Sequence, residues 1–423
     1  MLKQKTWVKA VAAVGIALGL TLTGNAEAQM MQPPVRQQRI EGLYTNNLQA
    51  AEYFQIGVNR YQRGDLQAAE RALNQALRFD PYIPVAYYIL GNALLEQGQF
   101  EKAVSQYRQA LSFDPNLDNV YYNLGVALYS QGKPGEAIDA FQQAIALDPD
   151  FASAYYNLGL AFETQGNLQA AREAYREALQ IQPKNASAYY NLGLIATREG
   201  QFGQAIGLLG QAVDLNPDFA EAYYQLGIAH AQLDQTEEAI QAFGRSVQLE
   251  PENALAQYNL GVLFSQEDNF KGAAGRFERA VALDSDNVSA YRQLGASLLA
   301  TGKYEEAVNT LQTALSLEPD NPLTYYNLGV AYQLQELYSE AIDKYQEAIL
   351  LNPTLAEAFY NLGIAYGQTG QTEQAIAFLL EAKNLLRQEG KLEQITAIDQ
   401  YLEQLVLPTI APAQPPEEEV LVP

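Results

Sequence analysis

The stretch Tyr155-Tyr156-Asn157-Leu158-Gly159 decides the fold of this chain, because it returns at a fixed spacing. Tyr121-Tyr122-Asn123-Leu124-Gly125 precedes it by 34 residues, and Tyr189-Tyr190-Asn191-Leu192-Gly193 follows it by another 34. The glycine keeps this period without insertion or deletion at positions 57, 91, 125, 159, 193, 227, 261, 295, 329 and 363. A fixed period of this size is typical of stacked supersecondary units. The sequence therefore predicts a solenoid of ten repeats over residues 50–389.

Each repeat has the pattern of two helices joined by a turn. In the fourth, spacings of three, one and three residues place one group on a single face of a first helix, namely Tyr155, Leu158, Gly159 and Phe162. The turn at Gly166-Asn167 leads to a second helix, which Pro183 ends. Small residues let two helices approach closely, so we expect Gly159 and Ala171 to form the contact within the repeat.

This pattern resembles the tetratricopeptide repeat, whose signature is W-x₂-L-G-x₂-Y…A-x₃-F…P over 34 residues. Tyrosine or a smaller residue stands where the family often has tryptophan, as at Tyr155. The resemblance covers residues 50–389 and implies an all-α, right-handed superhelical solenoid of helix-turn-helix repeats. It also implies that the first helices line a concave groove, which holds peptides or partner proteins.

Residues 1–28 have the pattern of a secretory signal peptide. Three lysines come before an apolar run of 13 residues, Ala10 to Leu22, and Ala26-Glu27-Ala28 supplies a cleavage site of small residues. A membrane-spanning helix needs about 20 apolar residues. We therefore expect cleavage and a periplasmic or other extracytoplasmic location, with an uncleaved anchor as the alternative. Residues 29–49 are polar and predict a flexible lead-in to the array.

The array is followed by two further segments. Residues 390–407 carry Leu392, Ile395, Ile398, Leu402 and Leu405 at helical spacing. Because the last repeat of a solenoid has an exposed apolar face, this segment predicts a capping helix. Residues 408–423 hold five prolines and three consecutive glutamates, which predicts a disordered tail.

Composition restricts the chemistry that the chain can perform. It has 423 residues, a formal net charge of −23, one histidine and no cysteine. An acidic chain repels nucleic acid and anionic membrane surfaces. The missing cysteines exclude disulfides, thiolate catalysis and thiolate metal sites. The single histidine, His230, falls at a position that other repeats fill with Leu128, Phe162 or Phe264, so we expect packing rather than catalysis. We predict no catalytic residues, no metal site and no cofactor.

The predicted binding residues occupy the position of Tyr156 in the second to the tenth repeats. We expect this position to face the groove, where tyrosine offers flat apolar area and a hydroxyl; the set is Tyr88, Tyr122, Tyr156, Tyr190, Tyr224, Tyr258, Arg292, Tyr326 and Tyr360. The next residue could hydrogen-bond an extended peptide or its own neighbouring repeats; this second set is Asn123, Asn157, Asn191, Asn327 and Asn361. Packing of the tyrosines on adjacent helices is the alternative for each position.

Arg292 is the departure in this series, between Tyr258 and Tyr326. It could stack on an aromatic ring or meet a partner's carboxylate, so it is the first candidate for specificity. Plain drift in a tolerant repeat is the alternative. We expect a non-enzymatic scaffold that binds a protein or an extended peptide. A carbohydrate-binding or polysaccharide-export component is the alternative, although the only tryptophan, Trp7, lies in the signal segment.

Overall fold

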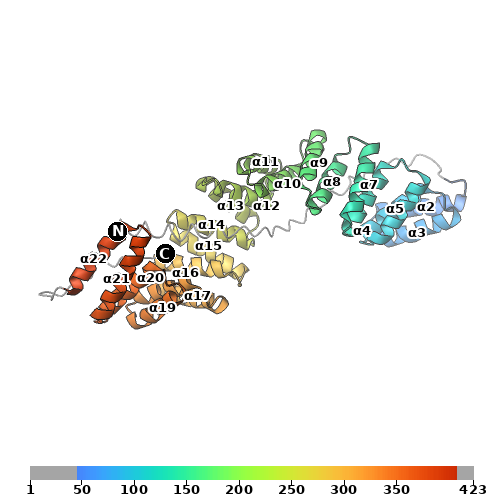
Figure 1. Cartoon of the computed structure of the whole chain (residues 1–423). Helices are drawn as coiled ribbons and strands as arrows, with labels where there is room; N and C mark the ends of the chain where they lie inside the picture. The colour runs from blue at the N-terminus through green and yellow to red at the C-terminus, as the bar shows by residue number, and fades with distance from the viewer. Residues whose placement is uncertain (1–44, 407–423) are drawn as a thin grey trace. The chain divides into compact units, whose positions relative to one another are not determined.

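The computed structural model describes residues 45–406, which form 21 helices and no strand within that range (Figure 1). The expected signal peptide at 1–28, most of the lead-in and the tail at 408–423 lie outside the described residues. The chain divides at residue 225 into two compact units. This boundary falls within α12 (Ala220–Ala231), and we describe each unit by itself.

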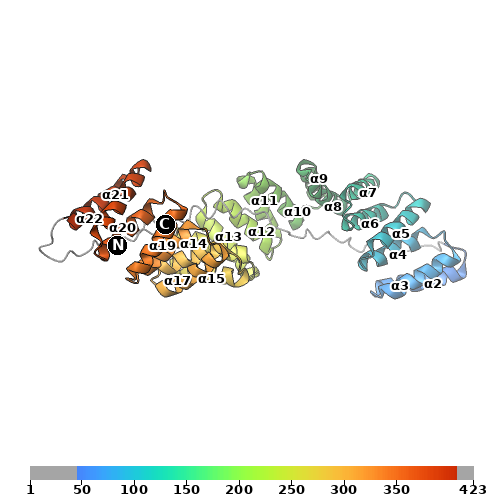
Figure 2. The ribbon, with the colours of Figure 1, turned by 60° about the horizontal axis from the view of Figure 1, so that its bottom comes forward.

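The N-terminal unit contains five helical hairpins, and consecutive helices pack against each other (Figure 2). Their first helices are α2 (Leu48–Gln62), α4 (Pro84–Glu96), α6 (Asp118–Ser130), α8 (Ala152–Thr164) and α10 (Ala186–Arg198). The second helices are α3 (Leu66–Phe79), α5 (Phe100–Phe113), α7 (Pro134–Leu147), α9 (Leu168–Ile181) and α11 (Phe202–Leu215).

The C-terminal unit continues the same period with α13 (Thr236–Leu249). Its first helices are α14 (Ala254–Gln266), α16 (Val288–Ala300), α18 (Pro322–Gln333) and α20 (Ala356–Gln368). The second helices are α15 (Phe270–Leu283), α17 (Tyr304–Leu317), α19 (Tyr338–Leu351) and α21 (Thr372–Gln388), and α22 (Leu392–Val406) ends the described chain. The sequence prediction of paired helices in every repeat is confirmed.

The repeating glycine is required by a close contact between the two helices of each hairpin. A Cβ added to Gly159 would lie 2.5 Å from the Tyr175 ring, a distance that real Cβ atoms do not show. The same clash recurs in the other repeats, for example between Gly125 and Phe141 at 2.6 Å. The contact of Gly159 with Ala171 stays a prediction; at the equivalent pair the Ala375 carbonyl oxygen would lie 3.2 Å from a Cβ added to Gly363. The glycine makes room for the aromatic or leucine side chain four residues after that alanine.

The turn within each hairpin needs a left-handed residue. In the fourth repeat Gly166 has a φ of +77°, and Asn167 then caps α9 by accepting a hydrogen bond from the Ala170 amide. Three repeats place another residue in this conformation, namely Asp234, Asp268 and Glu336, with φ of 56°, 57° and 61°. The uniform turn keeps the hairpins in register even where glycine is absent.

Helix α22 covers the apolar face of the last hairpin. Ile398 and Tyr401 are buried in one cluster with Leu379 and Leu386 of α21. The Tyr401 hydroxyl also lies so close to Gly367 that a side chain there would clash. This is the capping helix that the apolar spacing of residues 390–407 predicts.

Candidate functional site

Most of the tyrosines predicted to face a groove are buried inside the array. At most 7 % of the surface is exposed for Tyr122, Tyr156, Tyr190, Tyr258, Tyr326 and Tyr360, whereas Tyr88 and Tyr224 are half-buried. Their rings pack against the second helix of the same hairpin in several repeats, as Tyr156 does against Tyr175 with 5.6 Å between ring centroids. The prediction that these six side chains stand open to a groove is therefore wrong. Their contact with a partner stays a prediction.

The predicted asparagines are buried as well, and four of them join one repeat to the next. Asn123, Asn157, Asn191, Asn327 and Asn361 expose at most 4 % of their surface. The side-chain amide donates to the tyrosine hydroxyl 35 residues earlier, in the pairs Asn157–Tyr122 at 2.9 Å, Asn191–Tyr156 at 3.3 Å, Asn361–Tyr326 at 2.9 Å and Asn123–Tyr88 at 3.5 Å. Of the two roles open for this position, the structure supports bonding between repeats. We call this series the Tyr–Asn ladder.

Burial keeps the ladder tyrosines neutral. It raises the pKa of Tyr156 to about 12, although the hydrogen bond from Asn191 acts in the opposite direction. Burial likewise raises the pKa of Tyr122 and Tyr190. A neutral hydroxyl that accepts from an amide is therefore a structural element of the stack. It is not a poised acid or base.

Arg292 interrupts the ladder in the eighth repeat. Its Nη2 donates to Ser289 Oγ at 3.1 Å, and its Nε is buried without a hydrogen-bond partner among the described residues. Burial raises the pKa of the Tyr258 hydroxyl, and the charge of Arg292 acts on it in the opposite direction. Arg292 thus combines a permanent charge with an unsatisfied donor on a half-buried side chain.

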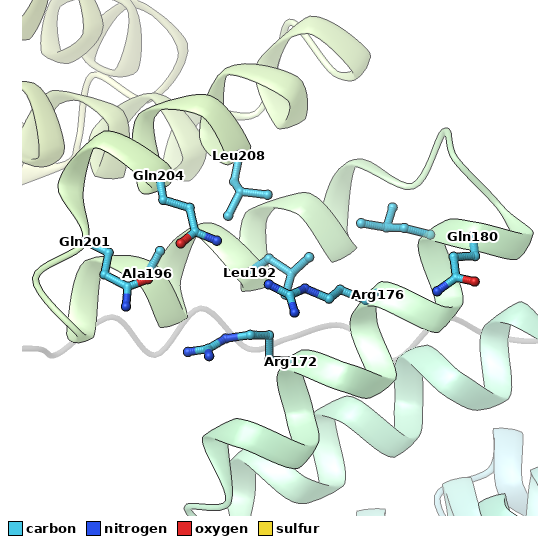
Figure 3. A pocket seen from close by; sticks show the side chains of 9 residues that line it. Arg172, Arg176, Gln180, Leu192, Ala196, Gln201, Gln204 and Leu208 are labelled. Carbon is cyan, nitrogen blue, oxygen red and sulfur yellow. The ribbon is translucent and has the colours of Figure 1, made fainter.

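A pocket of about 400 Å³ lies where the fourth hairpin meets the fifth. Figure 3 shows Arg172 and Arg176 extending from α9 towards Gln204 and Leu208 of α11. Apolar side chains from three helices line it, namely Leu179, Leu192, Ala196 and Leu208. The polar lining consists of Arg172, Arg176, Gln180, Gln201 and Gln204. Such a combination of apolar wall and few polar groups suits a small apolar group with a charged end.

The sequence-based search for a site missed this pocket, although the sequence contains a signal for it. Ala196 stands at the position that other repeats fill with larger side chains, namely Arg60, Leu94, Leu128, Phe162, His230, Phe264, Leu298, Tyr332 and Tyr366. A small residue in a series of large ones predicts missing volume at that junction. The small size of Ala196 becomes evident only when the repeats are compared with one another, because the motif within one repeat does not specify this position.

Neither a metal-ligand group nor a membrane-spanning helix is present among the described residues. Within 45–406, histidine, aspartate and glutamate side chains do not gather in a group that could hold a metal ion. His230 is half-buried, and its Nδ1 lies 2.7 Å from the Gln235 side-chain oxygen in the same turn. Every helix in this range is too short or too polar to cross a bilayer.

Sequence models of the tetratricopeptide repeat match the chain at residues 122–186, 91–132, 195–234, 295–336, 336–370, 220–253, 72–105, 174–207 and 356–385. Together the matches span 72–253 and 295–385, more than half of the 423 residues. No match was found among curated proteins.

Several solved structures are similar to parts of the chain. A crystal structure of MamA is 31 % identical and has a TM-score of 0.38, covering 39 % of this chain and 97 % of that one. YrrB, described as a tetratricopeptide repeat protein with an unusual peptide-binding site, is 26 % identical, with a TM-score of 0.40 and coverage of 44 % and 95 %. Yeast Tom70 is 15 % identical, with a TM-score of 0.36 and coverage of 84 % and 95 %.

Proposed function

Because the chain belongs to the tetratricopeptide repeat family, we propose that it is a non-enzymatic scaffold that binds a protein or an extended peptide through Arg292 and the surface around it. The proposal rests on the hydrogen bond between repeats that Arg292 cannot make. Tyr122, Tyr156 and Tyr326 at the same position accept a hydrogen bond from the next repeat, whereas Arg292 cannot accept one. A residue that cannot make the hydrogen bond between repeats is a candidate for binding a partner.

The chemistry of Arg292 favours a carboxylate as the group it recognises. A buried guanidinium N–H without an acceptor is unfavourable, since the water that it loses is not replaced. A carboxylate from a partner would supply two acceptors in the planar arrangement that a guanidinium matches. The Tyr–Asn ladder and the packing of the hairpins already order the array of repeats, so binding of a partner would not require further ordering of the array. The proposed partner therefore presents an aspartate, a glutamate or a chain terminus to the eighth repeat.

We further propose that the scaffold acts outside the cytoplasm. Support comes from the charged start, the apolar run and the small residues of 1–28. N-terminal sequencing of the protein isolated from its native source should begin at Gln29, and fractionation should place it in an extracytoplasmic compartment. Recovery from the cytoplasm with the first residues intact would contradict this part of the proposal.

The substitution Arg292→Tyr tests the binding proposal. The variant restores the residue usual at this position and gives Asn327 a possible ladder partner, so we expect a melting temperature equal to or above that of the unaltered protein. Crosslinking and pull-down from the native compartment should recover specific partners with the unaltered chain. Recovery of these partners should fall by about tenfold or more for Arg292→Tyr, as expected for loss of a charged hydrogen bond.

Arg279→Tyr is the matched control, because Arg279 is an exposed arginine on the second helix of the preceding hairpin. It removes the same charge and adds the same side chain elsewhere. Equal capture by both variants and by the unaltered protein would show that Arg292 does not bind the partner. An equal fall in partner recovery for both variants would show that the change in net charge, and not the position of Arg292, weakens binding.

A further inference from the structure

The pocket beside Ala196 can be compared with the same junction in later repeats. At the junction between the eighth and ninth hairpins, the residue equivalent to Ala196 is Tyr332, and its hydroxyl accepts a hydrogen bond from Gln312 Nε2 at 3.2 Å. At the next junction Tyr366 accepts from Gln346 Nε2 at 2.9 Å. At both junctions the space equivalent to the pocket beside Ala196 is thus filled by an aromatic ring with a terminal oxygen.

At the junction beside Ala196 an arginine stands in place of the donating glutamine. Arg176 occupies in the fourth repeat the position of Gln312 and Gln346. Leu208 likewise occupies the position of Phe378, which stacks on the Tyr366 ring with 5.4 Å between centroids. The junction of α9, α10 and α11 therefore keeps the apolar wall and the donor but lacks the ring between them.

The charged side chains that line the pocket are two arginines, Arg172 and Arg176. Arg176 makes no hydrogen bond or ion pair with another residue of the described chain. Arg172 is held by an ion pair with Glu199 and donates to Gln169 at 3.1 Å, so its charge is partly satisfied. Two exposed carboxylates of the same helix, Glu173 and Glu177, accept a hydrogen bond from Gln169 and Gln180 and keep their negative charge. The free guanidinium of Arg176 can pair with an anion.

We propose that this pocket binds an aromatic ring that carries a carboxylate, with the ring against Leu192, Ala196 and Leu208 and the carboxylate on Arg176. The ring of the ligand takes the place of the missing side chain. The arginine selects an anionic oxygen, whereas Gln312 and Gln346 donate to a neutral hydroxyl at their junctions. The proposal depends on the geometry of this junction and not on the binding role of Arg292. A free small molecule and an aromatic side chain beside an acidic one in a partner offer the same chemistry.

Calorimetry and ligand-observed NMR on the full chain can test this inference with three probes. They are 3-phenylpropionate as the small molecule, 3-phenylpropanamide as its neutral analogue and an amidated tripeptide of phenylalanine between two aspartates as the peptide. We expect saturable binding of at least one anionic probe and binding about tenfold weaker for the neutral analogue. The stronger of the two anionic probes identifies the source of the ligand.

Two substitutions locate the binding. Ala196→Tyr fills the pocket as Tyr332 and Tyr366 do at their junctions, so it should preserve or raise the melting temperature and abolish binding. Arg176→Gln copies the two junctions that contain Gln312 and Gln346, and it should weaken the anionic probes about tenfold without changing the neutral one. Ala196→Leu, which copies Leu128 and Leu298, serves if the tyrosine variant does not fold. Unchanged binding in the filled variants, or binding of none of the probes, would overturn the proposal.

Discussion

At Gly159 the two helices of one hairpin approach until only a hydrogen atom fits between them. A methyl group there must displace the Tyr175 ring, which is buried and cannot move far. We therefore expect Gly159→Ala to lower the free energy of unfolding by about 1–3 kcal/mol, the usual cost of overpacking a core. Urea denaturation followed by circular dichroism measures this difference.

Gly207→Ala is the matched control for that prediction. Gly207 lies in the middle of α11, and an added Cβ would meet nothing within 4 Å. Alanine has the higher helix propensity, so this change should raise stability by up to about 1 kcal/mol. Effects of the same sign at Gly159 and Gly207 would contradict the steric explanation of the repeating glycine.

Glu336 is the least suitable of the three residues that replace the turn glycine. Its φ of 61° lies in the left-handed region, which aspartate tolerates better than glutamate. We expect Glu336→Gly to raise the free energy of unfolding by about 1 kcal/mol, because glycine adopts this conformation without strain. Melting curves of Glu336→Gly and of Gly302→Ala measure the cost of the left-handed backbone. Gly302→Ala should be destabilised, because residue 302 has a φ of +79°. A fall in stability for Glu336→Gly would show that the glutamate side chain contributes more than its backbone costs.

The helices could be predicted from the sequence because each hairpin carries its own markers. The glycine, the alanines and the proline of the fourth repeat fix two helices and their ends without reference to any other repeat. The burial of Tyr156 could not be predicted in this way. The next repeat covers that tyrosine, and the pattern within one hairpin is the same whether its second tyrosine is covered or open. The prediction that Tyr156 stands open to a groove failed for this reason, whereas the fold prediction did not.

The Tyr–Asn ladder makes the stack of helices sensitive to alkaline pH. In the folded protein burial raises the pKa of Tyr156 to about 12, from the value of 10.0 that we assign to the unfolded chain. The neutral form is thus favoured by folding, and its contribution is fully present below pH 10 and lost as the pH rises to about 12. Between these values the unfolded chain releases a proton that the folded chain keeps, so stability falls by up to about 1.4 kcal/mol per pH unit for this residue.

Urea midpoints measured from about pH 8 to about pH 12 test this dependence. The curve should be nearly flat at first and then fall, and Tyr156→Phe should make the fall less steep while lowering stability at pH 8, because Asn191 loses its acceptor. Tyr53→Phe is the control, since Tyr53 is exposed and should not change the slope. A slope above pH 10 that is the same in all three proteins would rule out the ladder as its cause.

At the scale of the whole molecule, the net charge of −23 is the dominant electrostatic feature. It could be read from the sequence directly, and it acts against compact packing because like charges in neighbouring repeats repel. The ion pairs of the array act in the opposite direction, and those of Arg108 with Glu136 and Lys303 with Glu306 are exposed to solvent. Such exposed pairs contribute little, about 0–1 kcal/mol each. Repulsion should therefore exceed attraction at low ionic strength.

This balance predicts that salt stabilises the protein. Raising the salt from about 0.01 M to about 0.1 M shortens the Debye length from about 30 Å to about 10 Å, so repulsion between repeats is screened before contacts within an ion pair are. We expect the free energy of unfolding to rise by on the order of 1 kcal/mol, the size of a surface ion pair. Urea midpoints in sodium chloride measure it, and Lys303→Gln, which makes the net charge more negative, should steepen the dependence. A fall in stability with added salt would mean that the ion pairs, and not the excess of carboxylates, control the electrostatics of the array.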